Sequence, residues 1–247
     1  MSCVRGCTVA LLMAAVAWIG CGSNTSPVDP GTQSTLALYA LSTYGPATDA
    51  FQGDTSTGAL KPTGASQPAA PNPVDAVASA SGKFLYVVAG GSDQLSVYSI
   101  ASDGSLTTAF AQAAPGMLPI GTRLIARAGN RIFIAGLYSL AVMAIQDTNG
   151  AVVPLYTASF TASSAARAIA VDPAGKFVYV LHDQIGFGTA PLSVFSVDAS
   201  TATMTQISGS PFSVPGPAGA LAVDNAGKFL YVTTNTALGA PPNDQIL

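Results

Sequence analysis

Gly82-Lys83-Phe84-Leu85-Tyr86-Val87 is the stretch that decides the fold, because it returns three more times along the chain. The copies read GNRIFI from Gly129, GKFVYV from Gly175 and GKFLYV from Gly227, so the spacings are 47, 46 and 52 residues. A second stretch, LSVYSI at residues 95–100, recurs with similar spacing as LAVMAI at 140–145 and LSVFSV at 192–197. Two elements that keep one order and one period indicate a structural repeat.

Each repeat is predicted to contain four short strands, which in the third complete repeat are residues 169–171, 177–181, 192–197 and 203–207. Asp172-Pro173-Ala174-Gly175 is predicted to be the tight turn between the first two strands, and Asp-to-Gly turns join the third strand to the fourth. No segment has a 3.6-residue apolar period long enough for a helix. Four strands every 45 to 52 residues are typical of a β-propeller blade.

A single four-stranded sheet cannot bury both of its faces, so neighbouring blades must cover them. The aromatic residues of the repeated stretch are therefore expected to pack between blades rather than to bind a ligand. They are Phe84, Tyr86, Phe133, Phe177, Tyr179, Phe229 and Tyr231.

The composition agrees with an all-β fold. The 247 residues include 25 Gly and 17 Pro but no Glu, and only 9% are charged, against about 25% in ordinary soluble domains. The net charge of −3 provides no basic surface, which excludes nucleic acid as an expected partner.

The N-terminal residues are predicted to direct the protein to the cell envelope. Residues 1–20 are predicted to be a secretory signal, because Arg5 precedes a short apolar run from Thr8 to Gly20. Trp18-Ile19-Gly20-Cys21 resembles the lipobox of bacterial lipoproteins, which implies that Cys21 becomes a lipidated N-terminus and that the protein is anchored to the membrane. An ordinary secretory signal is the alternative. Residues 21–33 are predicted to be a flexible tether.

Residues 34–247 are predicted to form a partial propeller, with repeats at about 34–73, 74–118, 119–166, 167–218 and 219–247. The first repeat opens at what resembles a second strand, and the 215 residues from Gln33 onward correspond to about four and a half blades. We therefore expect the chain to be a fragment of a longer, seven-bladed protein.

The stretch DPAGKFVYV at 172–180, its relative at 224–232 and the strand at 192–197 resemble the lactonase family of seven-bladed propellers. That family includes 6-phosphogluconolactonase and carboxymuconate cyclase-like proteins. Residues 231–235 also resemble the YVTN repeat of bacterial surface propellers. The resemblance implies a site on one face of the ring, lined by His, Arg and an acidic residue, for a lactone with an anionic group.

Candidate site residues follow from propeller topology. His182, the sole histidine, and Asp183 follow the second strand of the third complete repeat, and Arg123 and Arg167 stand where first strands begin. These positions open on the same face, so we expect the four residues to share a rim. The imidazole could act as general base for water, while arginine holds an anionic substrate or the oxyanion. The alternative is a hydrogen-bonded loop histidine among solvated arginines.

No cofactor or metal is expected, because the sequence lacks a haem motif, a phosphate loop and enough histidines for a copper or zinc centre. The Asp-to-Gly turns lack the spacing of calcium loops. Two functions remain open. The first is a lipid-anchored binding or scaffolding module for a small anionic lactone or another envelope ligand. The second is a periplasmic lactone hydrolase that uses His182 with Arg123 or Arg167, with Asp183 beside them.

Overall fold

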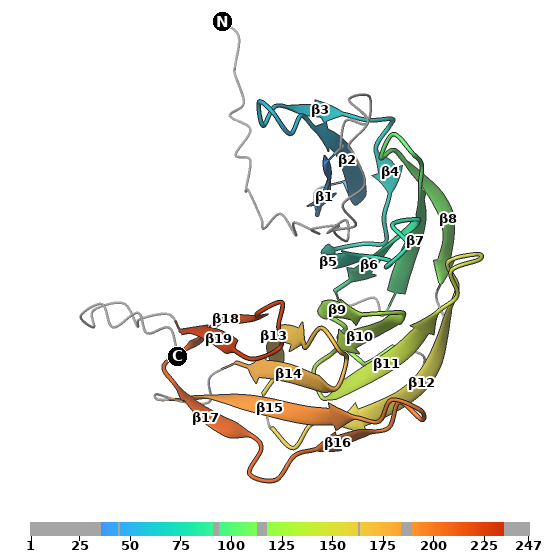
Figure 1. The fold of residues 1–247 in the computed structure, drawn as a ribbon. Coiled ribbons are helices and arrows are strands. Elements are labelled where there is room, and N and C mark those ends of the chain that lie inside the picture. The colour runs from blue at the N-terminus through green and yellow to red at the C-terminus, as the bar shows by residue number, and fades with distance from the viewer. Residues whose placement is uncertain are drawn as a thin grey trace, which may run out of the picture.

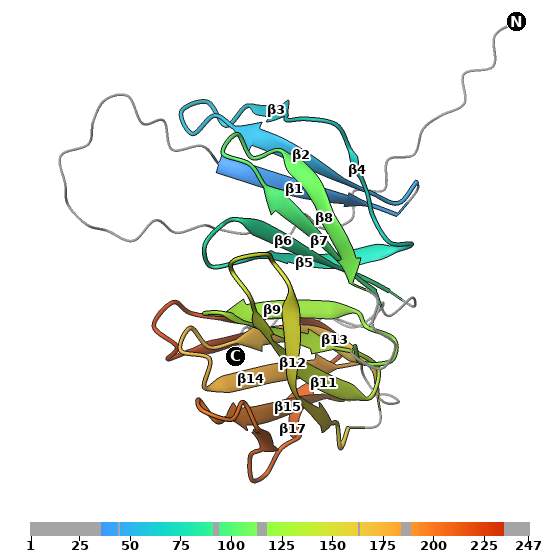
Figure 2. The same cartoon turned by 90° about the vertical axis from the view of Figure 1, so that its right-hand side faces the viewer.

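A computed structural model describes residues 36–43, 45–90, 94–112, 118–162, 164–183 and 189–234. Every regular element in these ranges is a β-strand, and the strands form antiparallel sheets that follow one another in an open arc (Figure 1). Seen from the side, successive sheets lie against one another (Figure 2). In that part of the chain there is no helix long and apolar enough to cross a membrane. The predicted all-β architecture of a partial propeller is confirmed.

The sheets are called blades 1 to 5 in chain order. Blade 1 contains β1 (Leu36–Ser42), β2 (Ala47–Gly53), β3 (Leu60–Pro62) and β4 (Gln67–Pro68). Blade 2 contains β5 (Pro73–Ala78), β6 (Phe84–Ala89), β7 (Gln94–Ile100) and β8 (Leu106–Gln112). Blade 3 contains β9 (Leu124–Ala128), β10 (Arg131–Ala135), β11 (Ser139–Ile145) and β12 (Val152–Ser159). Blade 4 contains β13 (Ala166–Val171), β14 (Phe177–His182), β15 (Thr189–Val197), β16 (Met204–Gln206) and β17 (Phe212–Pro215), and blade 5 contains β18 (Ala218–Val223) and β19 (Leu230–Thr234).

The strands of blades 2 and 3 pair in chain order, and β5, β9, β13 and β18 lie on the inner side of the arc (Figure 1). β1 corresponds to a second strand, because Tyr39 stands at the position that Tyr86 occupies in β6. In blade 4 the inner strand starts at Ala166, three residues before the predicted start, because Ala166 still pairs with His182. The outer position is divided between β16 and β17, which both pair with β15.

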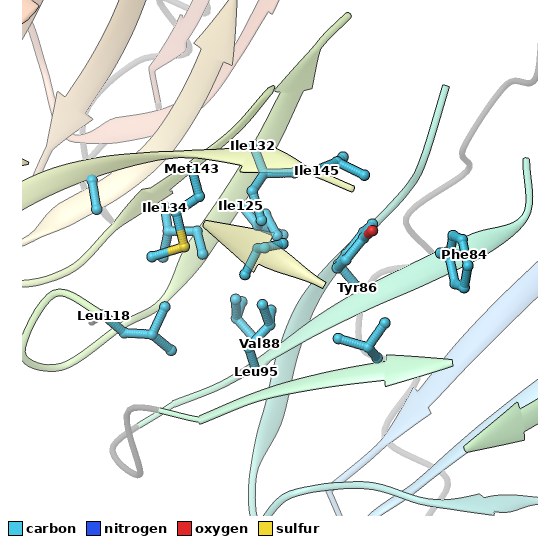
Figure 3. Packing of buried hydrophobic residues seen from close by; sticks show 13 residues of the cluster. Phe84, Tyr86, Val88, Leu95, Leu118, Ile125, Ile132, Ile134, Met143 and Ile145 are labelled. Atoms are coloured by element: carbon cyan, nitrogen blue, oxygen red, sulfur yellow. The ribbon is translucent and has the colours of Figure 1, made fainter. Parts of the chain in front are cut away.

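The hydrophobic core consists of layers between adjacent blades. Side chains alternate along β6, so that Phe84, Tyr86 and Val88 pack toward blade 3, while Leu85 and Val87 pack toward blade 1. Figure 3 shows the labelled side chains of blades 2 and 3 gathered in one such layer. Equivalent clusters join blade 3 to blade 4 and blade 4 to blade 5. Each blade is thus held by its neighbours rather than by a core of its own.

A buried tyrosine also links each of the first two blades to the turn between the third and fourth strands of the next blade. The Tyr86 hydroxyl donates to the carbonyl oxygen of Gly150 at 3.0 Å, and the Tyr39 hydroxyl donates to that of Gly104 at 3.3 Å. Gly150 has a φ of 76°, and a Cβ there would lie 2.5 Å from the Phe84 ring. Burial raises the pKa of Tyr39 to about 12, so its hydroxyl stays protonated as a donor.

The junction of blades 3 and 4 reaches the same turn by other means. Phe133 stands at the tyrosine position and has no hydroxyl, but Arg131, two residues earlier, donates to the backbone carbonyls of Asp198 and Ala199. These carbonyls lie at the start of the turn between β15 and β16. A guanidinium donor thus takes the place of the tyrosine hydroxyl.

The aromatic residues predicted to pack between blades divide into two groups. Phe84, Tyr86 and Phe133 are buried as predicted, and Tyr179 is partly buried against blade 5. Three others are exposed, so the prediction is wrong for them: Phe177, Phe229 and Tyr231. Within the described residues, blade 5 contains only β18 and β19. It therefore presents no turn between a third and a fourth strand to cover Phe177, whereas the turn at Gly150 of blade 3 covers Phe84.

Tyr86→Phe is expected to lower the free energy of unfolding by about 1–2 kcal/mol, because the buried carbonyl of Gly150 loses its donor. The change is measured by urea denaturation. Tyr231→Phe removes the same hydroxyl from an exposed ring and serves as the matched control, with an expected effect below about 0.5 kcal/mol. Equal effects of the two substitutions would show that the link between blades contributes nothing.

Candidate functional site

One face of the arc carries the beginnings of the inner strands and the ends of the second strands. Antiparallel pairing brings these ends together: Ala166 at the start of β13 pairs with His182 at the end of β14. The backbone N–H of Arg123, just before β9, likewise donates to the carbonyl of Ala135 at the end of β10. We call this side of the molecule the entry face.

Three predicted site residues, Arg123, Arg167 and Asp183, lie at the strand ends of the entry face and are called the entry-face cluster. Arg123 of blade 3 lies 3.9 Å from the carboxylate of Asp183, which follows β14 of blade 4. The backbone N–H of Asp183 donates to the carbonyl of Ala165, two residues before Arg167. Both partners of the ion pair are half exposed, so the pair itself adds little stability.

Arg167 is presented by a β-bulge. The register between β13 and β14 shifts between Ala166 and Ala168, which leaves Arg167 outside the ladder with its side chain exposed. The same irregularity occurs in β5 and leaves Val74 exposed there. Bulges commonly re-aim a side chain beside a functional site. Within the described residues the Arg167 side chain has no hydrogen-bond or ion-pair partner, so it can meet a ligand.

The structure places His182 differently from the prediction. It is the last residue of β14 and is fully buried, so the expectation of a rim loop is wrong. Nδ1 lies 2.9 Å from the Ser164 carbonyl oxygen and Nε2 lies 2.9 Å from the Ser193 hydroxyl oxygen. Because a carbonyl can only accept, Nδ1 carries the proton and Nε2 accepts from Ser193. The Phe160 ring packs edge-on at 4.7 Å.

This environment favours a neutral His182. Burial lowers the pKa of its imidazole, while the Ser164 carbonyl and the charge of Asp183 act in the opposite direction. Both ring nitrogens are already hydrogen-bonded and neither faces solvent, which does not favour the predicted role of general base. Through the Ser164 carbonyl, His182 instead holds the connection between blades 3 and 4 against the end of β14. It thereby positions Asp183 and the start of β13. The pairing with Ser193 has no signal in local spacing, because the two residues are eleven positions apart.

Asp75 is the residue that sequence reasoning missed. It lies in the inner strand β5, where Oδ2 accepts the backbone N–H of Ile125 in β9 at 3.0 Å and Oδ1 accepts that of Ala76. Burial raises the pKa of Asp75 to about 6, although the two hydrogen bonds act to lower it. A carboxyl that changes charge near neutral pH thus contacts β9 two residues from Arg123. The available signal was that Asp75 is the one acidic residue within the sequences of β5, β9, β13 and β18.

The described part of the chain holds no group of three or more His, Cys, Asp or Glu side chains that could bind a metal ion. Cys21, the predicted lipidation site, lies outside the described residues, as do the predicted signal segment and tether.

Comparison with known proteins agrees with the architecture. A family model described as "Lactonase, 7-bladed beta-propeller" matches residues 33–238. No curated protein sequence matches the chain. A solved protein from Lactobacillus plantarum is 21% identical, with a TM-score of 0.64, and the match covers 80% of this chain and 60% of that one.

A proposed 6-phosphogluconolactonase from Bacteroides uniformis is 15% identical, with a TM-score of 0.65, and the match covers 82% of this chain and 61% of that one. A protein of unknown function from Desulfotomaculum acetoxidans is 16% identical, with a TM-score of 0.62 and coverages of 81% and 62%. This chain therefore spans about three fifths of the length of these structures. At such identities the likeness establishes the fold.

The buried His182 is expected to make stability dependent on pH. Its folded pKa lies below the ordinary value of about 6.5, so the unfolded chain binds the proton more readily and the folded state loses stability as pH falls below 6.5. His182→Gln removes the imidazole that takes up this proton, so the variant does not lose this part of its stability as the pH falls. The gap in free energy of unfolding between wild type and variant should therefore narrow from pH 7.5 to pH 5, measured by urea denaturation at each pH. The titration of Asp75 is common to both proteins and cancels in this comparison, and a gap that stays constant would contradict the assignment.

Proposed function

The chain belongs to the lactonase family of seven-bladed β-propellers, and from this premise we propose that it binds a small anionic ligand, of the lactone or sugar-acid class, at the entry-face cluster. The activity is that of a binding or scaffolding module at the cell envelope. Lactone hydrolysis at the same place is the second candidate.

The placement of Arg123 and Arg167 on the entry face of adjacent blades carries the proposal. Arg167 is exposed and has no side-chain partner within the described residues, and Arg123 is engaged by Asp183 only through a half-exposed contact at 3.9 Å. A guanidinium presents several donors in a planar fork that matches carboxylate and phosphate groups. Because the whole chain has a net charge of −3, attraction of an anion depends on these local arginines.

The position and pKa of Asp75 favour the second candidate. With a pKa of about 6, the carboxyl is mostly ionised at neutral pH and can accept a proton. As a general base it would take a proton from water, whose oxygen adds to the lactone carbonyl carbon while arginine stabilises the oxyanion. The bond from this carbon to the ring oxygen then breaks, and the ring oxygen leaves as a hydroxyl with the proton that Asp75 returns. His182 could serve as the base only if its buried contacts opened.

Calorimetric titration with 6-phosphogluconate tests the binding proposal. Arg123→Ala and Arg167→Ala are each expected to weaken binding about tenfold or more, because each removes a charge-assisted contact. Lys61→Ala on the exposed strand β3 removes the same charge elsewhere and should leave the affinity unchanged. If neither arginine variant differs from wild type, the proposed site is wrong. Hydrolysis of 6-phosphogluconolactone above the spontaneous rate, lost in Asp75→Asn with ligand binding kept, would instead support the hydrolase.

We also propose that the protein is held at the bacterial envelope by a lipid on Cys21, on the basis of the sequence pattern at residues 18–21. In a bacterial host the wild-type protein is expected in the detergent phase after phase partitioning, and Cys21→Ser in the aqueous phase. Cys7→Ser is the matched control, because Cys7 lies within the predicted signal segment. Detergent partitioning that survives Cys21→Ser would rule out the lipid anchor.

A further inference from the structure

Two large apolar side chains on the entry face of blade 3 are exposed without an evident structural reason. Ile120 is 70% exposed and Tyr138 is 64% exposed. Phe229, which is similarly exposed, belongs to blade 5, the last blade within the described residues, whereas blade 3 is packed between blades 2 and 4. Within the described residues these two side chains are open to solvent on the face that carries the entry-face cluster, so they are candidates for contact with a ligand.

The backbone around Ile120 and Tyr138 is held in place by hydrogen bonds. The N–H of Leu137 donates to the carbonyl of Ile120 at 2.9 Å, and the N–H of Phe160 donates to the carbonyl of Tyr138 at 2.9 Å. The buried Thr122 hydroxyl donates to the carbonyl of Pro119 at 2.6 Å. The two loops, residues 119–122 and 136–138, are therefore joined to each other and to the residue that follows β12 of the same blade.

Two glycines allow this close approach. A Cβ at Gly136 would lie 2.5 Å from the Ile120 carbonyl oxygen, and a Cβ at Gly121, whose φ is 64°, would lie 2.5 Å from the Leu137 side chain. Any larger residue at either position would push the loops apart. The exposed side chains thus project from a preorganised platform, and binding would cost little additional loop ordering.

The platform lies beside the arginine of the proposed anion site. Arg123 follows Ile120 by three residues, and its backbone N–H donates to the Ala135 carbonyl, three residues before Tyr138. Arg123 therefore directly follows the loop that carries Ile120 and is hydrogen-bonded to the end of the strand that precedes Tyr138. A guanidinium, an exposed phenol ring and an aliphatic side chain on neighbouring backbone segments of one face fit a molecule that carries an anionic group on a flat apolar ring.

We infer that Tyr138 and Ile120 form the apolar half of the ligand site, and that the ligand is a small anion with a flat ring or ring face that lies on Tyr138 while its anionic group meets Arg123. This inference rests on the proposed function and adds the class of ligand. The charge of the ligand is recognised by Arg123, and its ring is recognised by the platform.

Titration of the protein with benzoate, acetate and benzyl alcohol, followed by NMR chemical shifts, separates the two halves of the site. Benzoate is expected to bind about tenfold more tightly than acetate, because the ring adds buried apolar area. Tyr138→Ala and Ile120→Ala should reduce this preference severalfold and leave acetate binding unchanged. Arg123→Ala should weaken both anions, and benzyl alcohol should bind less tightly than benzoate.

Tyr156→Ala is the matched control, because Tyr156 is an exposed tyrosine on the outer strand β12, and it should change nothing. If Tyr138→Ala and Ile120→Ala keep the full preference for benzoate, the inference is wrong even where Arg123→Ala weakens both anions. If Arg123→Ala leaves acetate and benzoate binding unchanged, the anion site itself is wrong, and the proposed function fails with it.

Discussion

A four-stranded sheet with two apolar faces is stable in water only when both faces are covered, and the rest of this structure depends on that requirement. The buried clusters all lie between neighbouring blades. The hydrogen bonds of Tyr39, Tyr86 and Arg131 join blades 1, 2 and 3, respectively, to a turn of the next blade. A tyrosine hydroxyl and the Arg131 guanidinium thus do the same thing, which is to donate a hydrogen bond to a backbone carbonyl in the turn of the next blade. The requirement is for a donor to that carbonyl rather than for one residue type.

The same packing assembles the entry face. Arg123 and Asp183 come from different blades, and they approach because inner strands begin where second strands end. Their backbones are held by sheet hydrogen bonds rather than by loop contacts alone, so the cationic groups project from a rigid framework. His182 supports this arrangement from within, because its two ring nitrogens tie the preceding connection and β15 to the end of β14. A rigid framework with variable loops is how one fold serves different ligands.

The repeat predicted the fold well because the same residues encode the turn, the strand and the packing in every copy. It placed Tyr86 and Phe133 in the core, but a periodic pattern shows only which face a side chain points to, so the exposure of Phe229 was not visible in it. His182 was misplaced for a related reason. Its burial is determined by Phe160 and Ser193, which are distant along the chain and carry no recognisable spacing.

Asp75 occupies a position at which the blades differ in residue type. By sheet register, the equivalent positions in blades 3 and 4 hold Leu124 and Ala168, so the fold does not require a carboxyl there. Because the folded pKa of about 6 exceeds the ordinary value of 3.8, the Asp75 carboxyl favours the folded state fully only below about pH 4, and this contribution is lost as pH rises through 6. At neutral pH the protein thus carries a partly buried charge that lowers its stability relative to acidic pH. The Asp75 carboxylate accepts the backbone N–H of Ile125 in the next blade, so it joins blades 2 and 3, and it is also the group that the second candidate function would use as its base.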